Sequence, residues 1–201
     1  IEKILLCMGP YGVGTRILAE RMGTLLSFTT PKGEPDIDAA GPGQLDPREL
    51  VETYRFKSHT KDTRIYGIVG KPLTATSSPV IHNAAYTHGK HDGVYVPFPA
   101  DTLSGFLSLA EELGLEGASV TIPYKEEILS HLACRAIEVD QVGACNTIIR
   151  TGRGWSGFNT DTRGFSDSLL EFLGRKQLRG LRITVVGAGG VARAAVSELK
   201  R

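Results

Sequence analysis

The run Leu181-Arg182-Ile183-Thr184-Val185-Val186 leads directly into Gly187-Ala188-Gly189-Gly190-Val191-Ala192 and then into an alanine-rich segment. An apolar run, a glycine turn and a helix-forming run predict a strand, a tight turn and the start of a helix. Glycine lets the backbone approach a phosphate closely, and the first turn of the helix presents free N–H groups to it. The stretch therefore predicts a dinucleotide-binding βα unit, whose phosphate-holding residues are Gly187, Ala188, Gly189, Gly190 and Val191.

A single βα unit is only the beginning of a dinucleotide-binding domain, which needs further strand and helix pairs. The chain starts with Ile1 rather than Met, and Ile4 to Met8 already has the composition of a buried strand. We therefore expect a segment of a longer polypeptide. The acidic residue or arginine that separates NAD from NADP binding follows the turn by about 20 residues. That position falls after Arg201, so the turn itself leaves the choice of nicotinamide cofactor open.

Charge and cysteine content limit the classes of partner. The chain has 23 Lys and Arg against 22 Asp and Glu, a formal net charge of +1, which gives no reason to expect nucleic acid or an anionic membrane. A small-molecule substrate is expected instead. The three cysteines lack metal-ligand spacing and predict reduced thiols, as in the cytoplasm or a plastid stroma, and no metal site. No apolar run approaches the about 20 residues of a membrane span.

Two parts of the chain alternate strand-like and helical patterns, which predicts the α/β class with parallel strands. In the first part, the expected elements are strands at Ile4–Met8 and Leu25–Thr29, a helix around Thr15–Met22 and a helix capped by Asp46. A polar linker follows. The second part predicts these elements: strands Ile65–Val69, Val94–Phe98, Ala118–Ile122, Thr147–Arg150 and Trp155–Phe158, helices from Pro79, over Leu103–Leu113 and over Asp161–Leu173, and short helices up to Val139.

Three further motifs contain polar residues near predicted strand ends, where α/β sheets bind ligands. The loop that includes Thr76 and Ser78 has more hydroxyls than helix capping requires and would suit a polyol or a carboxylate. On spacing alone, Lys125 is better interpreted as a solvated charge, and Asn146 and Asp161 as turn formers. None of these motifs identifies a catalyst by itself.

In this order, however, the motifs resemble the shikimate dehydrogenase family over Ile65 to Arg201. The matching segments are Gly70-Lys71-Pro72-Leu73-Thr74-Ala75-Thr76-Ser77-Ser78-Pro79-Val80-Ile81-His82, Val120-Thr121-Ile122-Pro123-Tyr124-Lys125, Gly143-Ala144-Cys145-Asn146-Thr147, Asn159-Thr160-Asp161 and the glycine turn. The resemblance implies NADPH-dependent reduction of 3-dehydroshikimate to shikimate. It assigns catalysis to Lys125 and Asp161, and substrate contacts to Thr76, Ser78, Thr121 and Asn146.

The hydroxyl-rich loop departs from the family pattern at two positions. Thr76 stands where the family usually has serine, and Ala75 where it has histidine. Threonine keeps the hydroxyl but adds a methyl group that restricts its rotamer. A quinate dehydrogenase with related substrate contacts therefore remains an alternative.

The opening stretch resembles the end of a type I 3-dehydroquinate dehydratase, a (β/α)8 barrel that uses a Schiff-base lysine. The similarity rests on Leu5–Gly9, Gly12–Arg16 and Gly41–Gln44. It implies that Arg16 and Gln44 hold the substrate, while Ala40 replaces the usual serine of the second loop. The family's catalytic lysine and histidine lie in earlier strands, so this part is not expected to dehydrate substrate alone.

Dehydratase followed by dehydrogenase is the order of the fused enzymes of the shikimate pathway. We expect four parts: a barrel remnant at 1–57, a linker at 58–63, a substrate domain at 64–179 and the start of a Rossmann NADP domain at 180–201. A substrate-binding module without catalytic activity is the second alternative, because most of the cofactor domain does not follow.

Overall fold

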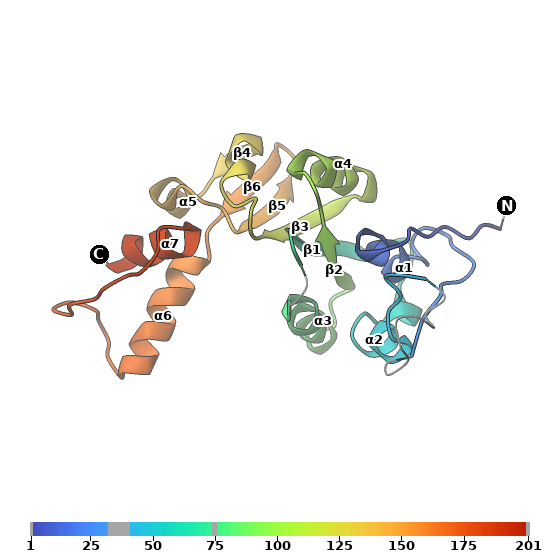
Figure 1. Cartoon of the computed structure of the whole chain (residues 1–201), viewed down its shortest axis with the longest axis horizontal. Helices are drawn as coiled ribbons and strands as arrows, with labels where there is room; N and C mark the ends of the chain where they lie inside the picture. The colour runs from blue at the N-terminus through green and yellow to red at the C-terminus, as the bar shows by residue number, and fades with distance from the viewer. Residues whose placement is uncertain (1, 32–40, 74–75, 200–201) are drawn as a thin grey trace. The chain divides into compact units, whose positions relative to one another are not determined.

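The computed structural model describes residues 2–31, 41–73 and 76–199 (Figure 1). The chain separates into two compact units, Ile1–Ala118 and Ser119–Arg201. Ala40 and Ala75, two of the three departures from the family patterns, lie outside the described residues, whereas Thr76 is described. In the part that is described, no helix is long and apolar enough to cross a membrane.

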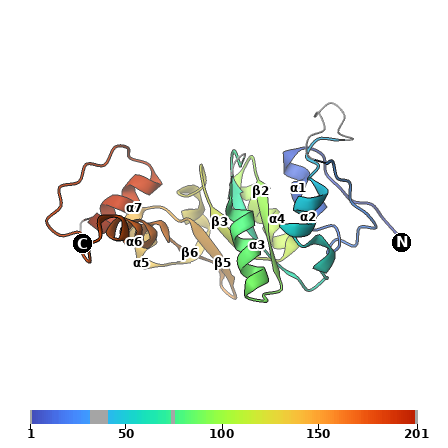
Figure 2. The same ribbon diagram turned by 90° about the horizontal axis from the view of Figure 1, so that it is seen from below.

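The first unit alternates helices and strands after a short opening segment. Its elements are η1 (Pro10–Gly12), α1 (Val13–Ile17), α2 (Pro47–Glu52), η3 (Phe56–Ser58), β1 (Arg64–Gly70), α3 (Ser78–His88), β2 (Gly93–Pro99), α4 (Leu103–Leu113) and the beginning of β3 (Leu115–Val120). β1 and β2 are parallel, in a register that runs from Arg64 opposite Gly93 to Gly70 opposite Pro99. α3 and α4 lie on opposite faces of this strand pair, as Figure 1 and Figure 2 show.

Local signals in the sequence explain these helices. The Asp46 carboxylate accepts a hydrogen bond of 2.8 Å from the Arg48 N–H, so the cap expected at the start of α2 is confirmed. The Thr102 hydroxyl accepts from the Gly105 N–H at the start of α4, and Gly114 ends that helix at φ 65°. α4 buries Leu103 and Phe106, which places its apolar face toward the core.

The second unit continues with shorter strands and two longer helices. Its elements are η4 (Glu127–His131), β4 (Leu132–Arg135), α5 (Ile137–Val142), β5 (Thr147–Thr151), β6 (Gly154–Phe158), α6 (Asp161–Leu173) and α7 (Gly190–Leu199). The hydrogen-bonded strand order is β2-β1-β3-β5-β6-β4. The strands thus form a mixed α/β sheet, which confirms the fold class.

The mixed character corrects the expectation of parallel strands at one place. β4 and β6 are parallel, but β5 and β6 are antiparallel, with Thr147 opposite Phe158. Only Gly152 and Arg153 connect β5 to β6. A connection of that length permits a hairpin but not a parallel crossover, which needs a dozen or more residues.

Three predicted strands are wrong within the described residues. Ile4–Met8 and Leu181–Val186 form no strand, and Leu25–Thr29 contributes only one bridge, from Thr29 to Leu45. An apolar run becomes a strand only when a neighbouring strand satisfies its backbone groups. Much of these runs is exposed here, including Leu25 at 60% and Val186 at 95%.

Smaller differences concern boundaries and one missed strand. The helix expected to reach Met22 ends at Ile17 in α1, and β3 ends at Val120, before a turn closed by the Tyr124 N–H and the Thr121 carbonyl. Leu132–Arg135, expected to be helical, forms β4 beside β6. A four-residue strand contains too few residues to show a period-2 pattern.

Candidate functional site

Lys125 and Asp161 form an ion pair in the second unit. The Lys125 Nζ lies 2.7 Å from Asp161 Oδ2, and their side chains are only 16% and 30% exposed. Lys125 comes from the turn after β3, and Asp161 is the first residue of α6. The two residues are far apart in the sequence, and the fold brings them into direct contact. Such a pair orients the lysine, while its amino group retains further N–H donors for a ligand.

Asn146 fixes the other carboxylate oxygen of Asp161. Its Nδ2 donates to Asp161 Oδ1 at 2.8 Å and to Thr160 Oγ1 at 2.9 Å. Its Oδ1 accepts from the Thr160 N–H at 3.0 Å and from the Thr147 hydroxyl at 2.9 Å. The structure thus brings Asn146 into the Lys125–Asp161 group. Both carboxylate oxygens of Asp161 are engaged, which restricts its rotamer.

Asn159 anchors the backbone next to the Lys125–Asp161 pair. The sequence alone had assigned it no role in the site. Its side chain is buried, donates to the Ala144 carbonyl at 2.8 Å and accepts from the Asp161 N–H at 3.1 Å. The end of β6 is therefore tied to the loop that precedes Asn146. The only sequence signal was the Asn159-Thr160-Asp161 motif, because a turn-forming asparagine and a buried anchoring one look the same in a sequence.

The glycine turn lies next to Lys125. Gly187 has φ 116°, a conformation that side chains disfavour, and α7 begins at Gly190 as expected. A Cβ at Gly190 would lie 3.6 Å from Lys125 Cδ, whereas one at Gly187 or Gly189 would meet nothing within 4 Å. The turn therefore has open backbone at the N-terminus of a helix, which fits a phosphate group.

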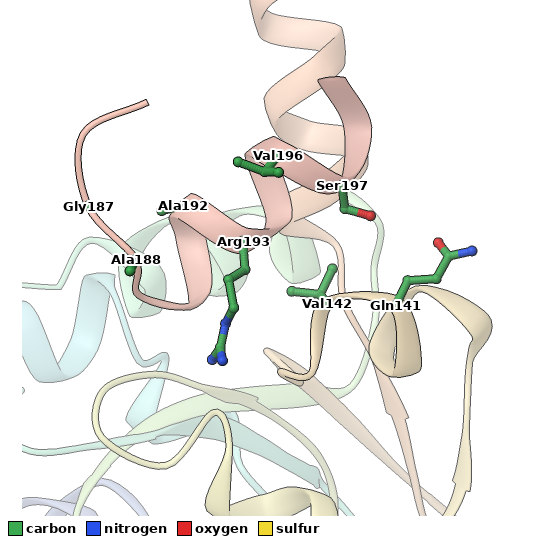
Figure 3. A pocket seen from close by; sticks show the side chains of 8 residues that line it. All are labelled: Gln141, Val142, Gly187, Ala188, Ala192, Arg193, Val196 and Ser197. Atoms are coloured by element: carbon green, nitrogen blue, oxygen red, sulfur yellow. The ribbon is translucent and has the colours of Figure 1, made fainter. Parts of the chain in front are cut away.

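Two cavities adjoin this turn. One, of about 890 Å³, is lined by Thr121, Lys125, Gly189 and Gly190 together with apolar side chains of α6. Thr121, a predicted substrate contact, thus shares a cavity with Lys125. The other, of about 600 Å³, lies beside α7 and α5 and includes Ala188 and Arg193 (Figure 3).

Thr76 and Ser78 belong to the first unit, at the start of α3. The Ser78 N–H donates to the Thr76 hydroxyl at 3.2 Å, and Ser77, the N-cap, makes no side-chain cap hydrogen bond. The helix therefore begins one residue earlier than a Ser78 cap would place it. That these hydroxyls contact the same substrate as Lys125 stays a prediction.

Arg16 and Gln44 lie around Met8 in the first unit. Arg16 is 1% exposed; its Nη2 donates to Met8 Sδ at 3.8 Å, and its Nε is buried without a hydrogen-bond partner. Burial lowers the pKa of the Arg16 guanidinium. A Cβ at Gly41 would lie 3.3 Å from Met8 Sδ and 3.6 Å from Gln44 Nε2, so both side chains lie close to Gly41; the Gln44 amide also contacts the Thr30 hydroxyl. The Arg16 Nη1 also donates to the Phe28 carbonyl at 3.4 Å, so both hydrogen bonds of this buried cation are long.

Comparison with known proteins gives the same two parts. Residues 1–61 match the family described as type I 3-dehydroquinase, and residues 68–148 match the shikimate dehydrogenase substrate binding domain. A chloroplastic bifunctional 3-dehydroquinate dehydratase/shikimate dehydrogenase of Arabidopsis thaliana is 32% identical over 209 residues, which cover 96% of this chain and 34% of that protein. A shikimate dehydrogenase (NADP(+)) of Geobacter metallireducens is 44% identical, over 71% of this chain and 50% of that protein.

Solved structures agree. Shikimate dehydrogenase from Aquifex aeolicus superposes with a TM-score of 0.67 at 31% identity, over 71% of this chain and 53% of that one. The enzyme from Thermus thermophilus, solved with NADP(H) and shikimate, gives a TM-score of 0.61 at 31% identity, over 68% of this chain and 52% of that one. The chain thus spans about half the length of the dehydrogenases that it matches, and about a third of the bifunctional relative.

Proposed function

We propose that this chain belongs to the bifunctional 3-dehydroquinate dehydratase/shikimate dehydrogenase family and carries the substrate-binding and proton-transfer groups for the NADPH-dependent, reversible reduction of 3-dehydroshikimate to shikimate. One observation carries the proposal: Lys125 Nζ and Asp161 Oδ2 lie 2.7 Å apart, in a group that also includes Asn146.

Lys125 is the proposed proton donor. When the ring carbonyl becomes an alcohol, its oxygen takes a proton from the Lys125 ammonium, and in the reverse direction the amine takes the proton back. Asp161 keeps the Lys125 amino group oriented, and Asn146 holds the carboxylate in place. Thr76, Ser78 and Thr121 would bind substrate hydroxyls and carboxylate, since each has a hydroxyl that can donate and accept.

NADPH fits the glycine turn and supplies the hydride when bound. Gly187, Ala188, Gly189, Gly190 and Val191 would hold its phosphates, which is supported by the open backbone at Gly187 and Gly189 and by the helix that starts at Gly190. The choice of NADP over NAD follows the names of the dehydrogenase relatives.

The test is to measure turnover and binding separately in wild type and in Lys125→Ala. We expect the oxidation of shikimate with NADP⁺ to fall by about 10²- to 10⁴-fold, while the dissociation constant for shikimate changes little by calorimetry. Lys176→Ala, at an exposed lysine of the same unit, is the control. Unchanged turnover in Lys125→Ala would refute the assignment. Quinate serves as the comparison substrate, because a quinate dehydrogenase is the alternative activity. The relatives and solved structures that the chain matches give no support to that alternative.

A second candidate is a module that binds substrate but does not turn it over. It is favoured by the backbone of Leu181–Val186, which pairs with no strand among the described residues and so provides no sheet for a nucleotide to bind against. Calorimetry separates the two: shikimate binding with no detectable NADP⁺ binding supports the module, and binding of both supports the enzyme.

For the opening stretch we propose a role in binding an anionic ligand through Arg16 and Gln44. The buried, weakly partnered guanidinium supports this. We keep the division into 1–57, 58–63, 64–179 and 180–201 as a proposal. The chloroplastic name of the Arabidopsis relative supports the stroma as the compartment that keeps Cys7, Cys134 and Cys145 reduced.

A further inference from the structure

An ion pair links the glycine-turn helix to the residue that follows the proposed proton donor. Arg193 of α7 donates through Nη2 to Glu126 Oε1, and Glu126 directly follows Lys125 in the chain. The Arg193 N–H also donates to the Gly189 carbonyl at 3.0 Å. Arg193 is therefore connected to the glycine turn through its backbone and to the Lys125 segment through its side chain.

The two segments joined by this pair are also in van der Waals contact. The position of a Cβ at Gly190 lies 3.6 Å from Lys125 Cδ and 3.6 Å from the Ala144 Cβ. The Lys125 carbonyl accepts from the Cys145 N–H at 2.8 Å, which fixes the backbone of the lysine. Any movement of α7 along its axis would change the spacing between the glycine turn and a lysine that is itself held in place.

The apolar contacts of α7 on its inner side are small. Ala194 is 1% exposed and packs in a buried cluster with Val142 and Ala144. Alanine and valine contacts gain from burial but have little directionality, so they allow a helix to slide. A charge-assisted hydrogen bond is directional, so the Arg193–Glu126 pair can fix the position of α7 along its axis, which the apolar contacts do not.

The pair is too exposed for its main effect to be on stability. The side chains of Arg193 and Glu126 are 37% and 62% exposed, and exposed ion pairs contribute little to the free energy of unfolding. We propose that Arg193 and Glu126 are positioning residues that hold the glycine turn against Lys125 and so set the spacing between a bound dinucleotide and the Lys125–Asp161 pair. This inference rests on the proposed function.

A competing explanation is that Arg193 binds a cofactor phosphate itself. Arg193 lines the same cavity as Gly187 and Ala188, where its guanidinium extends from α7 (Figure 3). The two explanations predict opposite signs for Glu126→Gln. Removing a negative charge near the turn strengthens the binding of an anion if Arg193 acts as a phosphate ligand. It weakens that binding if Glu126 acts by holding α7 in place.

The experiment combines a double-mutant cycle with a structural measurement. Arg193→Gln, Glu126→Gln, the double variant and Arg193→Lys are compared by NADP⁺ calorimetry. Hydrogen exchange of the amide at position 193, which donates to the Gly189 carbonyl in the turn, is followed without any ligand. Arg163→Gln is the matched control, because Arg163 forms an exposed ion pair with Asp167 within α6 of the same unit.

We expect each single Gln variant to weaken NADP⁺ binding by about five- to tenfold, the double variant to be no weaker than either, and Arg193→Lys to restore most of the affinity. Exchange of the amide at position 193 should become faster in the Gln variants and stay unchanged in Arg163→Gln.

Tighter NADP⁺ binding in Glu126→Gln, or additive losses in the double variant, would overturn the inference in favour of a direct phosphate contact. Unchanged exchange of the amide at position 193 would overturn it as well. If the wild-type chain binds no NADP⁺, the proposed function loses its cofactor step, and the exchange measurement alone still decides whether the ion pair positions the turn.

Discussion

Replacing Asn159 with alanine is expected to destabilise the second unit by about 2 to 4 kcal/mol. Asn159 is 3% exposed and makes two hydrogen bonds, to the Ala144 carbonyl at 2.8 Å and from the Asp161 N–H at 3.1 Å. The first loss leaves a buried carbonyl without this donor, at a cost of about 1 to 3 kcal/mol. The second removes an acceptor from the first turn of α6, which costs about 0.5 to 2 kcal/mol.

Urea unfolding followed by tryptophan fluorescence measures this loss directly. Trp155 is the only tryptophan of the chain and lies on β6, so its emission reports on the unit that contains Asn159. At the usual dependence on urea, a loss of this size moves the midpoint by roughly 1 M or more. A change below about 1 kcal/mol would show that the two hydrogen bonds do not anchor the start of α6.

Asn83→Ala provides the matched control. Asn83 is 1% exposed and also makes two hydrogen bonds, to the Tyr95 carbonyl and from the Tyr95 N–H, both at 2.9 Å. Its loss is expected to destabilise the first unit by a similar amount. Only Asn159→Ala should also lower shikimate oxidation, by about 10- to 100-fold, because it alone frees the backbone of Asp161. Equal losses of turnover in both variants would assign the effect to stability.

Four further substitutions have defined outcomes. In Gly67→Ala, the new Cβ would overlap the Val96 carbonyl oxygen, so we expect the free energy of unfolding in urea to fall by about 1 to 3 kcal/mol. Gly164 lies at an exposed position of α6 where a Cβ meets open space, so Gly164→Ala should raise the free energy of unfolding by about 0.5 to 1 kcal/mol. Asp46→Ala should lower the free energy of unfolding by about 0.5 to 2 kcal/mol through the loss of the α2 cap, measured by thermal melting. Burial lowers the pKa of His59, so as the pH falls the unfolded chain takes up a proton on this histidine before the folded chain does. The free energy of unfolding should therefore decrease as the pH drops from about 7 to about 5. His59→Phe should flatten this decrease, and an unchanged slope would contradict the prediction.

Local patterns predicted the elements that have their own start and stop signals. α4 and α6 have the expected bounds, because Thr102 and Gly114 delimit one and Gly174 ends the other with a positive φ. The Asp46 cap and the start of α7 at Gly190 were equally visible in the sequence. Such signals depend on a few neighbouring residues, so they do not need the rest of the fold.

Strands were less predictable. Leu181–Val186 has a strand composition but no partner strand among the described residues, while the four residues of β4 form a strand because β6 lies beside them. The two-residue connection makes the pairing of β5 with β6 antiparallel. The composition of the two strands alone does not reveal this direction. A strand is defined by its hydrogen-bonding partner, and the partner is a property of the whole sheet.

The residue types of the candidate site were already specified along the chain: a lysine after one strand, an asparagine in a loop and an aspartate at a helix start. Folding in three dimensions was needed to establish that Lys125 and Asp161 are 2.7 Å apart, that Asn146 holds the second carboxylate oxygen, and that Arg193 reaches Glu126. Identity and local propensity are carried by neighbouring residues, whereas the distance between two charges separated by tens of residues is set by how the strands and helices between them pack.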